Sequence, residues 1–260
     1  MKAMILAAGL GTRLRPITND RPKALVEIDG RTLLEITLAR LRTFGIHEVI
    51  INAHHFADKL VDYLKANDMF GMTIEVSRED VLLDTGGGLK KTADFFLAEN
   101  PESEDPILVH NVDVISTIDL ARMAQVHTTN KALATLAVQD RETSRYLLFD
   151  ERLHLCGRRV GRDAPLEMVR PSRHVQSLAF TGIHIVSPRL FKKLTEQGVF
   201  SVITSYLRLA GQGETIHGFR ADEYYWRDLG RPDDLMQTAQ ELKGNGSLWK
   251  SGPSGPRKPY

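Results

Sequence analysis

Short apolar runs alternate with segments of helical periodicity through the first half of this chain. Each run has the length and apolar character of a buried strand, and the segments between them have the spacing of amphipathic helices. The expected strands are Ala3–Ala8, Glu48–Asn52, Met72–Ser77 and Pro106–Asn111, and the expected helices are Arg31–Phe44, His55–Lys65, Gly87–Ala98 and Asp119–His127. This alternation predicts right-handed βαβ units in a three-layer, Rossmann-like α/β fold, with a mostly parallel sheet and helices on both faces.

The first of these helices has clear start and stop signals. Thr32 and Glu35 have the spacing of a capping box, and Gly45 follows the last apolar position. Leu34, Leu38 and Leu41 recur at helical spacing. The pattern therefore predicts a helix that buries one face.

The character of the sequence changes after about residue 130. Strand-like runs there are joined by turn-rich connections, one of them the basic segment 157–162. We interpret residues 130–186 as an antiparallel extension at the edge of the sheet. The expected strands are Ala132–Val138, Tyr146–Phe149, Leu178–Val186, Glu214–Phe219 and Tyr224–Trp226, and the expected helices are Pro188–Leu194, Ser201–Leu209 and Pro232–Leu242.

Domain organisation follows from these patterns. The length of 260 residues and the hydrophobic content of 42% suffice for one large core, and no low-complexity linker divides the chain. We therefore expect one domain over residues 1–243. Residues 244–260 are rich in Gly, Pro and Ser, which predicts a flexible C-terminal tail.

Charge and cysteine content exclude several classes of protein. The 34 basic and 33 acidic residues nearly cancel, which argues against a nucleic-acid-binding protein. Cys156 is the only cysteine, so neither an intramolecular disulfide nor a zinc-thiolate cluster can form. No apolar stretch reaches the ~20 residues that span a bilayer, and the first residues lack the long apolar core of a signal peptide. We expect a cytoplasmic protein that does not bind membranes.

The first chemical signal is a glycine-rich loop directly after the first strand. Gly9 and Gly11 lack Cβ atoms, so backbone N–H groups can approach an anion closely, and Arg13 can add bidentate hydrogen bonds to phosphate. The loop matches neither the dinucleotide-binding fingerprint nor the Walker motif. Alone, it predicts little beyond a tight turn.

A second signal is Arg21-Pro22-Lys23-Ala24-Leu25-Val26, in which Pro22 fixes the backbone before Lys23. Together with Leu-Ala-Ala-Gly-x-Gly-Thr-Arg-Leu-x-Pro at residues 6–16, it resembles the signature of nucleotidyltransferases that activate sugar 1-phosphates. The resemblance implies a loop wrapped around a nucleoside triphosphate, with Arg13 and Lys23 facing its phosphates. The nucleotide-binding residues that it implies are Leu6, Ala8, Gly9, Gly11, Thr12, Arg13, Lys23, Gly86 and Gly87.

Two aspartates follow strand-like runs, at Asp113 and Asp228. Ligands of open α/β sheets bind at the carboxyl ends of strands, and Mg²⁺ takes one or two carboxylates plus phosphate oxygens. Both segments also resemble the metal-binding segments of the family. We therefore expect Asp113 and Asp228 to hold Mg²⁺ and, with Arg13 and Lys23, to be catalytic. Val112 stands where relatives commonly have glycine.

Three glycines open the helix expected after Asp84. Glycine is unfavourable in a helix interior by about 0.8–1.0 kcal/mol relative to alanine. One interpretation is a plain turn at a helix N-terminus. The alternative, which the resemblance favours, is recognition of the nucleotide base by Gly86 and Gly87.

The segments 180–183 and 226–230 are similar to those of N-acetylmuramate-1-phosphate uridylyltransferases and mannose-1-phosphate guanylyltransferase-like proteins. The resemblance implies UTP and an N-acetylmuramate or related hexose 1-phosphate as substrates, with Asn111, Gly182 and Glu167 as sugar-phosphate contacts. Many relatives have Glu-Lys where this chain has Glu167-Met168. The alternatives are a mannose- or heptose-1-phosphate guanylyltransferase, a cytidylyltransferase, a glycosyltransferase, and a non-catalytic protein that binds nucleotide sugars. The oligomeric state stays open.

Overall fold

Strands and helices alternate along the N-terminal part of the chain, as the sequence pattern predicts. The structure is a computed structural model that describes residues 1–98, 100, 102–161 and 163–244. Its described residues form two units. The N-terminal unit comprises residues 2–82, 111–117 and 226–244, and the central unit comprises residues 83–110 and 118–225 together with Met1. The expected tail at 245–260 lies outside the described residues.

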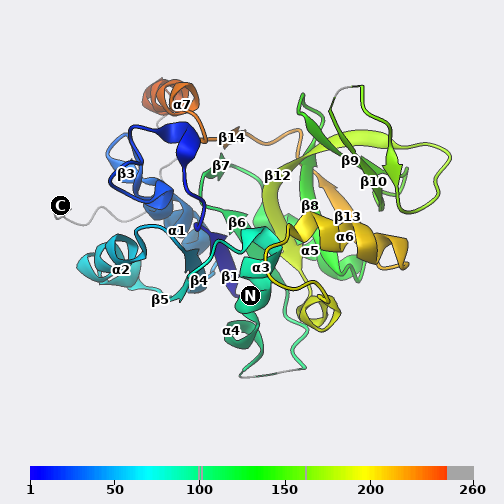
Figure 1. Cartoon of the computed structure of the whole chain (residues 1–260), viewed down its shortest axis with the longest axis horizontal. Coiled ribbons are helices and arrows are strands. Elements are labelled where there is room, and N and C mark those ends of the chain that lie inside the picture. Colours follow the sequence, from blue (N-terminus) through cyan, green and yellow to red (C-terminus); the bar gives the residue numbers. More distant parts are fainter. Residues whose placement is uncertain (99, 101, 162, 245–260) are drawn as a thin grey trace. The chain divides into compact units, whose positions relative to one another are not determined.

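The N-terminal unit is built on three parallel strands. Strand β4 (Glu48–Ala53) lies between β1 (Ala3–Leu6) and β5 (Thr73–Arg78) and pairs with both in parallel. Helices α1 (Leu33–Thr43) and α2 (Ala57–Ala66) make the two crossovers. Both crossovers step in the same direction along the sheet, so right-handed connection places both helices on one face (Figure 1).

The start of α1 is set by the predicted cap. Oγ1 of Thr32 accepts a hydrogen bond of 3.0 Å from the backbone N–H of Glu35. The helix starts at Leu33 rather than Arg31, because Arg31–Thr32 forms a short strand, β3, that pairs with β2 (Glu27–Ile28). The apolar face of α1 is buried, with Leu34, Leu38 and Leu41 fully inaccessible to solvent.

Two further pieces complete the N-terminal unit. Strand β14 (Trp226–Asp228) pairs antiparallel with β7 (Val114–Ser116), and helix α7 (Pro232–Gly244) follows and contacts β14 and β2. The segments 111–117 and 226–244 are far apart in sequence, and the pairing of β14 with β7 brings them together. The remaining short elements of this unit are the 3₁₀ turns η1 (Thr12–Leu14), η2 (Lys23–Leu25) and η3 (Asp68–Gly71).

The central unit is dominated by antiparallel pairing around one long strand. Strand β12 (Gln176–Val186) pairs antiparallel with β6, β8 and β9, whereas β13 pairs parallel with β8. The other strands are β6 (Ile107–Asn111), β8 (Ala134–Gln139), β9 (Arg145–Phe149), β10 (Leu155–Val160), β11 (Glu167–Met168) and β13 (Ile216–Arg220). The helices are α3 (Asp84–Lys91), α4 (Ala93–Leu97), α5 (Leu120–Thr129), η4 (Pro188–Lys193) and α6 (Val202–Gly211).

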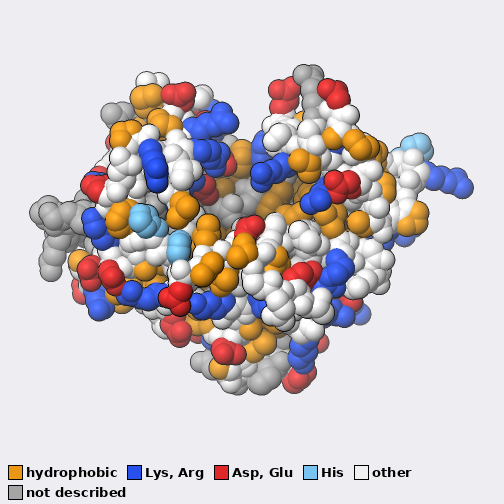
Figure 2. Space-filling view, in the orientation of Figure 1, with side chains coloured by type: hydrophobic (Ala, Val, Ile, Leu, Met, Phe, Trp, Pro, Cys, Tyr) orange, Lys and Arg blue, Asp and Glu red, His pale blue; other side chains and the backbone are white. Residues whose placement is uncertain are grey.

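The α/β class is confirmed, and the sheet is mixed. Parallel pairs join β1, β4 and β5, and antiparallel pairs join the strands of residues 130–186. Acidic and basic side chains are interspersed over the visible face, in keeping with the balanced composition (Figure 2). Within the described residues no helix is long and apolar enough to cross a membrane.

Two local predictions were wrong. The helix expected over 87–98 is two helices, which meet at Thr92, whose hydroxyl bonds back to the carbonyl of Leu89 at 2.8 Å. The basic segment expected as a turn belongs largely to strand β10. Arg158 forms an ion pair with Glu167, and Arg159 lies 4.8 Å from the ring centre of Tyr146, so cross-strand partners stabilise a strand that the local pattern does not indicate.

The core of the central unit contains histidines that are kept neutral. Both ring nitrogens of His127 are within hydrogen-bond distance of hydroxyls, at 2.9 Å from Thr135 Oγ1 and 3.0 Å from Ser187 Oγ. Burial, helped by the charge of Arg189, lowers the pKa of His127 to about 4. His184 packs against Phe180 and Tyr206, and burial lowers its pKa to about 3.

We predict that the protein loses stability as pH falls from about 7 to 4. An unfolded histidine binds its proton near pH 6.5, whereas folded His127 binds it only near pH 4. The unfolded state therefore takes up more protons in this window. The shift from 6.5 to about 4 is worth at most about 3 kcal/mol. Urea unfolding across the pH range measures the loss.

His184→Leu should reduce this acid sensitivity, because it removes one group that must stay neutral in the fold. His174→Leu is the matched control, since His174 is exposed. If the two variants and the wild type share one pH profile, buried His184 does not cause the loss.

Candidate active site

The glycine loop leaves strand β1 and is anchored at both ends. Ala7 and Ala8 are buried, whereas Gly9 and Leu10 are exposed. Gly11 has a φ of 64°, which favours glycine, and a Cβ there would lie 3.0 Å from Cγ2 of Thr18. The hydroxyl of buried Thr18 donates to the Gly11 carbonyl at 2.8 Å. The Gly11 end of the loop is thus held against Thr18.

The same loop presents unused hydrogen-bond donors. Among the described residues, none of the backbone N–H groups of Gly9, Leu10 and Gly11 has an acceptor. Successive N–H groups on a turn form a concave site for anions. The arrangement is therefore suited to phosphate oxygens.

Arg13 lies on the 3₁₀ turn that follows the loop. The next residue, Leu14, is fully buried and fastens the turn to the core. The Arg13 guanidinium lies so close to Gly230 that a Cβ on that glycine would be 2.6 Å from Nη2 of Arg13 and 2.7 Å from Oδ1 of Asp228. The absence of a side chain at Gly230 thus leaves room for the Arg13 guanidinium and the Asp228 carboxylate.

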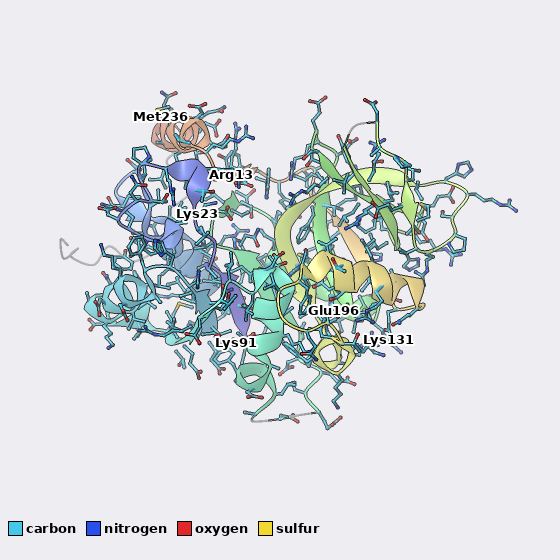
Figure 3. The ribbon with its side chains drawn as sticks, in the orientation of Figure 1. Arg13, Lys23, Lys91, Lys131, Glu196 and Met236 are labelled. Atoms are coloured by element: carbon cyan, nitrogen blue, oxygen red, sulfur yellow. The ribbon has the colours of Figure 1, made fainter. Side chains whose placement is uncertain are left out.

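Lys23 is the first residue of the turn η2, and Pro22 fixes the backbone before it. Pro22 has a φ of −68° and a ψ of 152°, and its carbonyl accepts from Leu25 N at 2.9 Å. Lys23 is 8% exposed, and its ammonium forms a close ion pair with the carboxylate of Asp113. Figure 3 shows Arg13 and Lys23 on the N-terminal segment of the chain.

Asp113 and Asp228 are brought together by backbone hydrogen bonds. Asp228 pairs with Val114 in the β14–β7 sheet, and the N–H of Leu229 donates to the carbonyl of Asp113 at 2.8 Å. Val112 is 3% exposed, and its N–H donates to the Leu6 carbonyl at 3.1 Å. The valine side chain therefore packs into the core, and Asp113 keeps its place beside Lys23.

The two carboxylates repel each other. Burial raises the pKa of Asp228, and the negative charge of Asp113 raises it further, whereas Lys23, the N–H of Gly230 and Arg13 oppose the rise. Oδ1 of Asp228 accepts that N–H at 2.7 Å. The pair is thus a site where an added cation is favourable.

This donor set fits Mg²⁺ that is shared with phosphate. Magnesium takes one or two carboxylates and completes its shell with water and substrate oxygens. Within the described residues, no group of three or more His, Cys, Asp or Glu side chains could hold a metal ion. Asp113 and Asp228 alone therefore suit a metal that arrives with a phosphorylated ligand rather than a permanent metal cage.

Comparison with known proteins identifies the family. A family model described as nucleotidyl transferase matches residues 2–245. The chain is 32% identical to N-acetylmuramate alpha-1-phosphate uridylyltransferase of Caulobacter vibrioides, over 92% of this chain and 96% of that protein. The chain belongs to the nucleotidyl transferase family. The resemblance to sugar-1-phosphate nucleotidylyltransferases is confirmed, and the chain is an enzyme of that class.

A second relative by sequence and one solved structure are also similar to this chain. D-glycero-alpha-D-manno-heptose 1-phosphate guanylyltransferase of Aneurinibacillus thermoaerophilus is 28% identical over 94% of this chain and 99% of that protein. A crystal structure of UDP-glucose pyrophosphorylase complexed with UDP-glucose superposes with a TM-score of 0.74, at 18% identity, over 94% of this chain and 98% of the other. At this low sequence identity, the similarity to the pyrophosphorylase structure shows a shared fold.

Several residues that are expected to contact the nucleotide or the sugar phosphate lie in the N-terminal unit. These are Leu6, Ala8, Gly9, Gly11, Thr12 and Asn111. They lie on the loop that follows β1 or at the carboxyl ends of β1 and β6. Together with Arg13, Lys23, Asp113 and Asp228 they belong to one unit, so the structure fixes the charged cluster and the loop relative to one another.

Gly86 and Gly87 belong to the central unit and have a packing role. Their N–H groups donate to the Phe200 carbonyl at 2.9 and 3.2 Å. A Cβ on Gly86 would lie 2.4 Å from the Phe200 ring, and one on Gly87 would lie 2.5 Å from the Gly198 carbonyl. The glycines therefore permit close packing between α3 and the segment before α6.

The expected sugar contacts Gly182 and Glu167 also lie in the central unit. Gly182 has a φ of 81° and lies where the register of β12 against β8 shifts. Glu167 is exposed, and its carboxylate accepts from Arg158 Nε at 2.7 Å. A ligand that uses Glu167 would have to share it with this arginine.

The sequence motifs did not single out the residues that hold the loop. Thr18 and Asn52 each bond to the backbone of the loop or of the residues that lead into it, and Glu79 bonds to Asn52. One signal was available for Asn52, which is a polar residue directly after the apolar residues 49–51 of its strand.

We predict that Asp228→Asn removes activity and stabilises the ligand-free enzyme. The raised pKa of Asp228 means that its ionised form costs folding free energy, and this cost appears as pH rises above about 4. The amide removes the repulsion. Turnover should fall about 100-fold or more, and the melting temperature should rise by about 2–4 °C.

Asp222→Asn is the control of opposite sign. Although burial alone would raise its pKa, the hydrogen bond from Arg220 and the Asp140 N–H lower the pKa of Asp222, so its charge is stabilising. The melting temperature of this variant should fall. A fall of equal size in Asp228→Asn would contradict the electrostatic account.

Gly230→Ala is predicted to disturb Arg13 and Asp228 together. Its methyl group would lie under 3 Å from both side chains, so one of them must move. We expect turnover to fall at least tenfold while the fold persists. Gly211→Ala, which meets the Val169 carbonyl at 3.1 Å, is the crowded control and should leave turnover unchanged. Wild-type turnover in Gly230→Ala would show that neither group needs this position.

Proposed function

We propose that this enzyme joins a nucleoside triphosphate to a sugar 1-phosphate and releases pyrophosphate. The observation that carries the proposal is the cluster of Lys23, Asp113, Asp228 and Arg13 beside a loop whose N–H groups are unused. Such a cluster provides cations, carboxylates and N–H donors for two phosphorylated ligands. The reaction proceeds without a covalent enzyme intermediate, so it requires no nucleophilic side chain.

In this reaction a phosphate oxygen of the sugar 1-phosphate attacks the α-phosphorus in line. A new P–O bond forms, the bond to the β-phosphate bridging oxygen breaks, and pyrophosphate leaves with the electron pair. Both reactants are anions, so catalysis rests on positioning and on neutralising charge.

Each charged group of the cluster has its own proposed role in binding and neutralising the phosphates. The loop N–H groups and Arg13 bind the phosphates that become pyrophosphate, and Arg13 stabilises the charge that develops there. Lys23 neutralises charge nearer the α-phosphate. Asp113 and Asp228 would hold Mg²⁺, which supplies positive charge to the phosphate oxygens when bound. Without ligand, Lys23 compensates the charge of Asp113. If that carboxylate held a cation, the Lys23 ammonium would be available to phosphate.

For the substrates, we propose UTP and N-acetylmuramate 1-phosphate or a related hexose 1-phosphate. The support is the uridylyltransferase relative at 32% identity over nearly the whole chain. The second candidate is GTP with a mannose or heptose 1-phosphate, which the guanylyltransferase relative at 28% identity favours. A non-catalytic binding role is disfavoured because the lysine and both carboxylates are present.

For the sugar 1-phosphate, the proposed contacts are Asn111, Gly182 and Glu167. Residues 130–186 are the region proposed to select the sugar. Gly86 and Gly87 stay candidates for the base through their carbonyl and Cα surfaces, since their N–H groups are engaged. The product would feed cell-wall or glycan synthesis, and a cytoplasmic location stays a prediction.

A matrix of substrates tests the proposal. UTP, GTP, CTP, ATP and dTTP are each paired with the 1-phosphates of N-acetylmuramate, glucose, mannose and a heptose, with Mg²⁺, and pyrophosphate release is measured. We expect UTP with N-acetylmuramate 1-phosphate to exceed GTP with mannose 1-phosphate at least tenfold in kcat/KM. The reverse order would establish the second candidate. Absence of reaction with every pair, in protein that is folded, would refute the proposed activity.

A further inference from the structure

A buried amide connects the glycine loop to a buried carboxylate. Asn52, near the end of β4, is 3% exposed, and its Oδ1 accepts from the backbone N–H of Ala7 at 2.7 Å. Its Nδ2 donates to Oε1 of Glu79 at 2.7 Å, and Glu79 is 4% exposed. All three residues belong to the N-terminal unit.

The orientation of this amide follows from its neighbours. The Ala7 N–H can only donate, so it must face the carbonyl oxygen of the side chain. The NH₂ group then faces Glu79, whose carboxylate accepts. Asparagine is the shortest side chain that carries both an acceptor and a donor of this kind, so a carboxylate in its place would satisfy Ala7 but would set two carboxylates against each other.

Glu79 is itself fixed by the backbone of β4. Its N–H donates to the Ala53 carbonyl at 2.8 Å, and its carbonyl is 2.7 Å from Nδ1 of His54. The end of β5 is therefore tied to the end of β4, and Asn52 extends the tie to the end of β1. Three parallel strands are locked together at their carboxyl ends, where ligands of such sheets bind.

We propose that Asn52 is a positioning residue for the phosphate-binding loop, held in place by Glu79. Ala7 is the last residue with an engaged N–H before the unused donors of Gly9, Leu10 and Gly11. Thr18 holds the far end of the loop at the Gly11 carbonyl. With both ends held, the intervening N–H groups have a fixed direction, and their ordering is complete before the anion arrives. The inference rests on the proposed function for the identity of that anion as a polyphosphate.

An exchange of the two partners tests the connection. Asn52→Asp removes the donor, and Glu79→Gln sets an amide against an amide and removes the charged acceptor. The double variant restores both hydrogen bonds with the original net charge, because its glutamine amide donates to the introduced carboxylate, which still accepts from the Ala7 N–H. We expect Asn52→Asp to weaken binding at least tenfold, Glu79→Gln to weaken it less, and the double variant to recover to within about threefold of wild type.

Binding is measured by calorimetry with two probes, inorganic tripolyphosphate and α,β-methylene UTP, both with Mg²⁺. The two probes should weaken together, because the loop contacts the phosphates that they share. Asn67→Asp is the matched control, since the Asn67 amide donates to the Tyr63 carbonyl on α2, and it should bind both probes as wild type does. Melting temperatures verify that each variant is folded.

Three results would overturn the proposal. The first is a double variant that binds as weakly as Asn52→Asp. The second is a loss with α,β-methylene UTP but not with tripolyphosphate, which would place Asn52 and Glu79 in base recognition. The third is a wild type that binds neither probe. Binding and rescue without turnover of any substrate pair would refute the proposed reaction alone.

Discussion

The ion pair between Lys23 and Asp113 is the interaction on which the charged cluster depends. Asp228 lies close enough to Asp113 for the negative charge of one carboxylate to raise the pKa of the other. Two partly buried carboxylates without a cation would be costly. Lys23 offsets that cost in the ligand-free enzyme, and Arg13 adds a second positive charge. The folded protein thus keeps a site that is electrostatically prepared for a metal and two polyanions.

Backbone geometry, rather than side-chain attraction, holds the like charges together. The β7–β14 pairing and the bond from Leu229 N to the Asp113 carbonyl involve backbone groups and not the side chains of residues 113 and 228. Gly230 then leaves room for the Arg13 guanidinium beside Asp228. The hydrogen bonds of this small sheet therefore offset the repulsion between the two carboxylates. In this way the fold maintains a site that is not optimal for stability.

The sequence alone predicts those site residues whose placement depends on a neighbouring strand end or turn. Lys23 follows a proline, and Asp113 follows a buried strand, so their placement depends on neighbours in sequence. The Asn52–Glu79 connection and the strand β10 depend on partners in other strands. Asn52 bonds to Ala7 across 45 residues, and Arg158 bonds to Glu167 from the opposing strand. Hydropathy periodicity contains no information on such pairs, so they could be recognised only from the fold.

The glycines show why a motif alone leaves function open. Gly9 and Gly11 flank N–H groups that have no acceptor among the described residues, whereas the N–H groups of Gly86 and Gly87 both donate to Phe200. In the first case glycine exposes the backbone to a ligand, and in the second it lets two segments of protein approach each other. Gly9 and Leu10 are exposed, so the donors of this loop are accessible to a ligand, whereas those of Gly86 and Gly87 are already engaged within the protein. The loop after β1 therefore has the stronger physical claim to the phosphates.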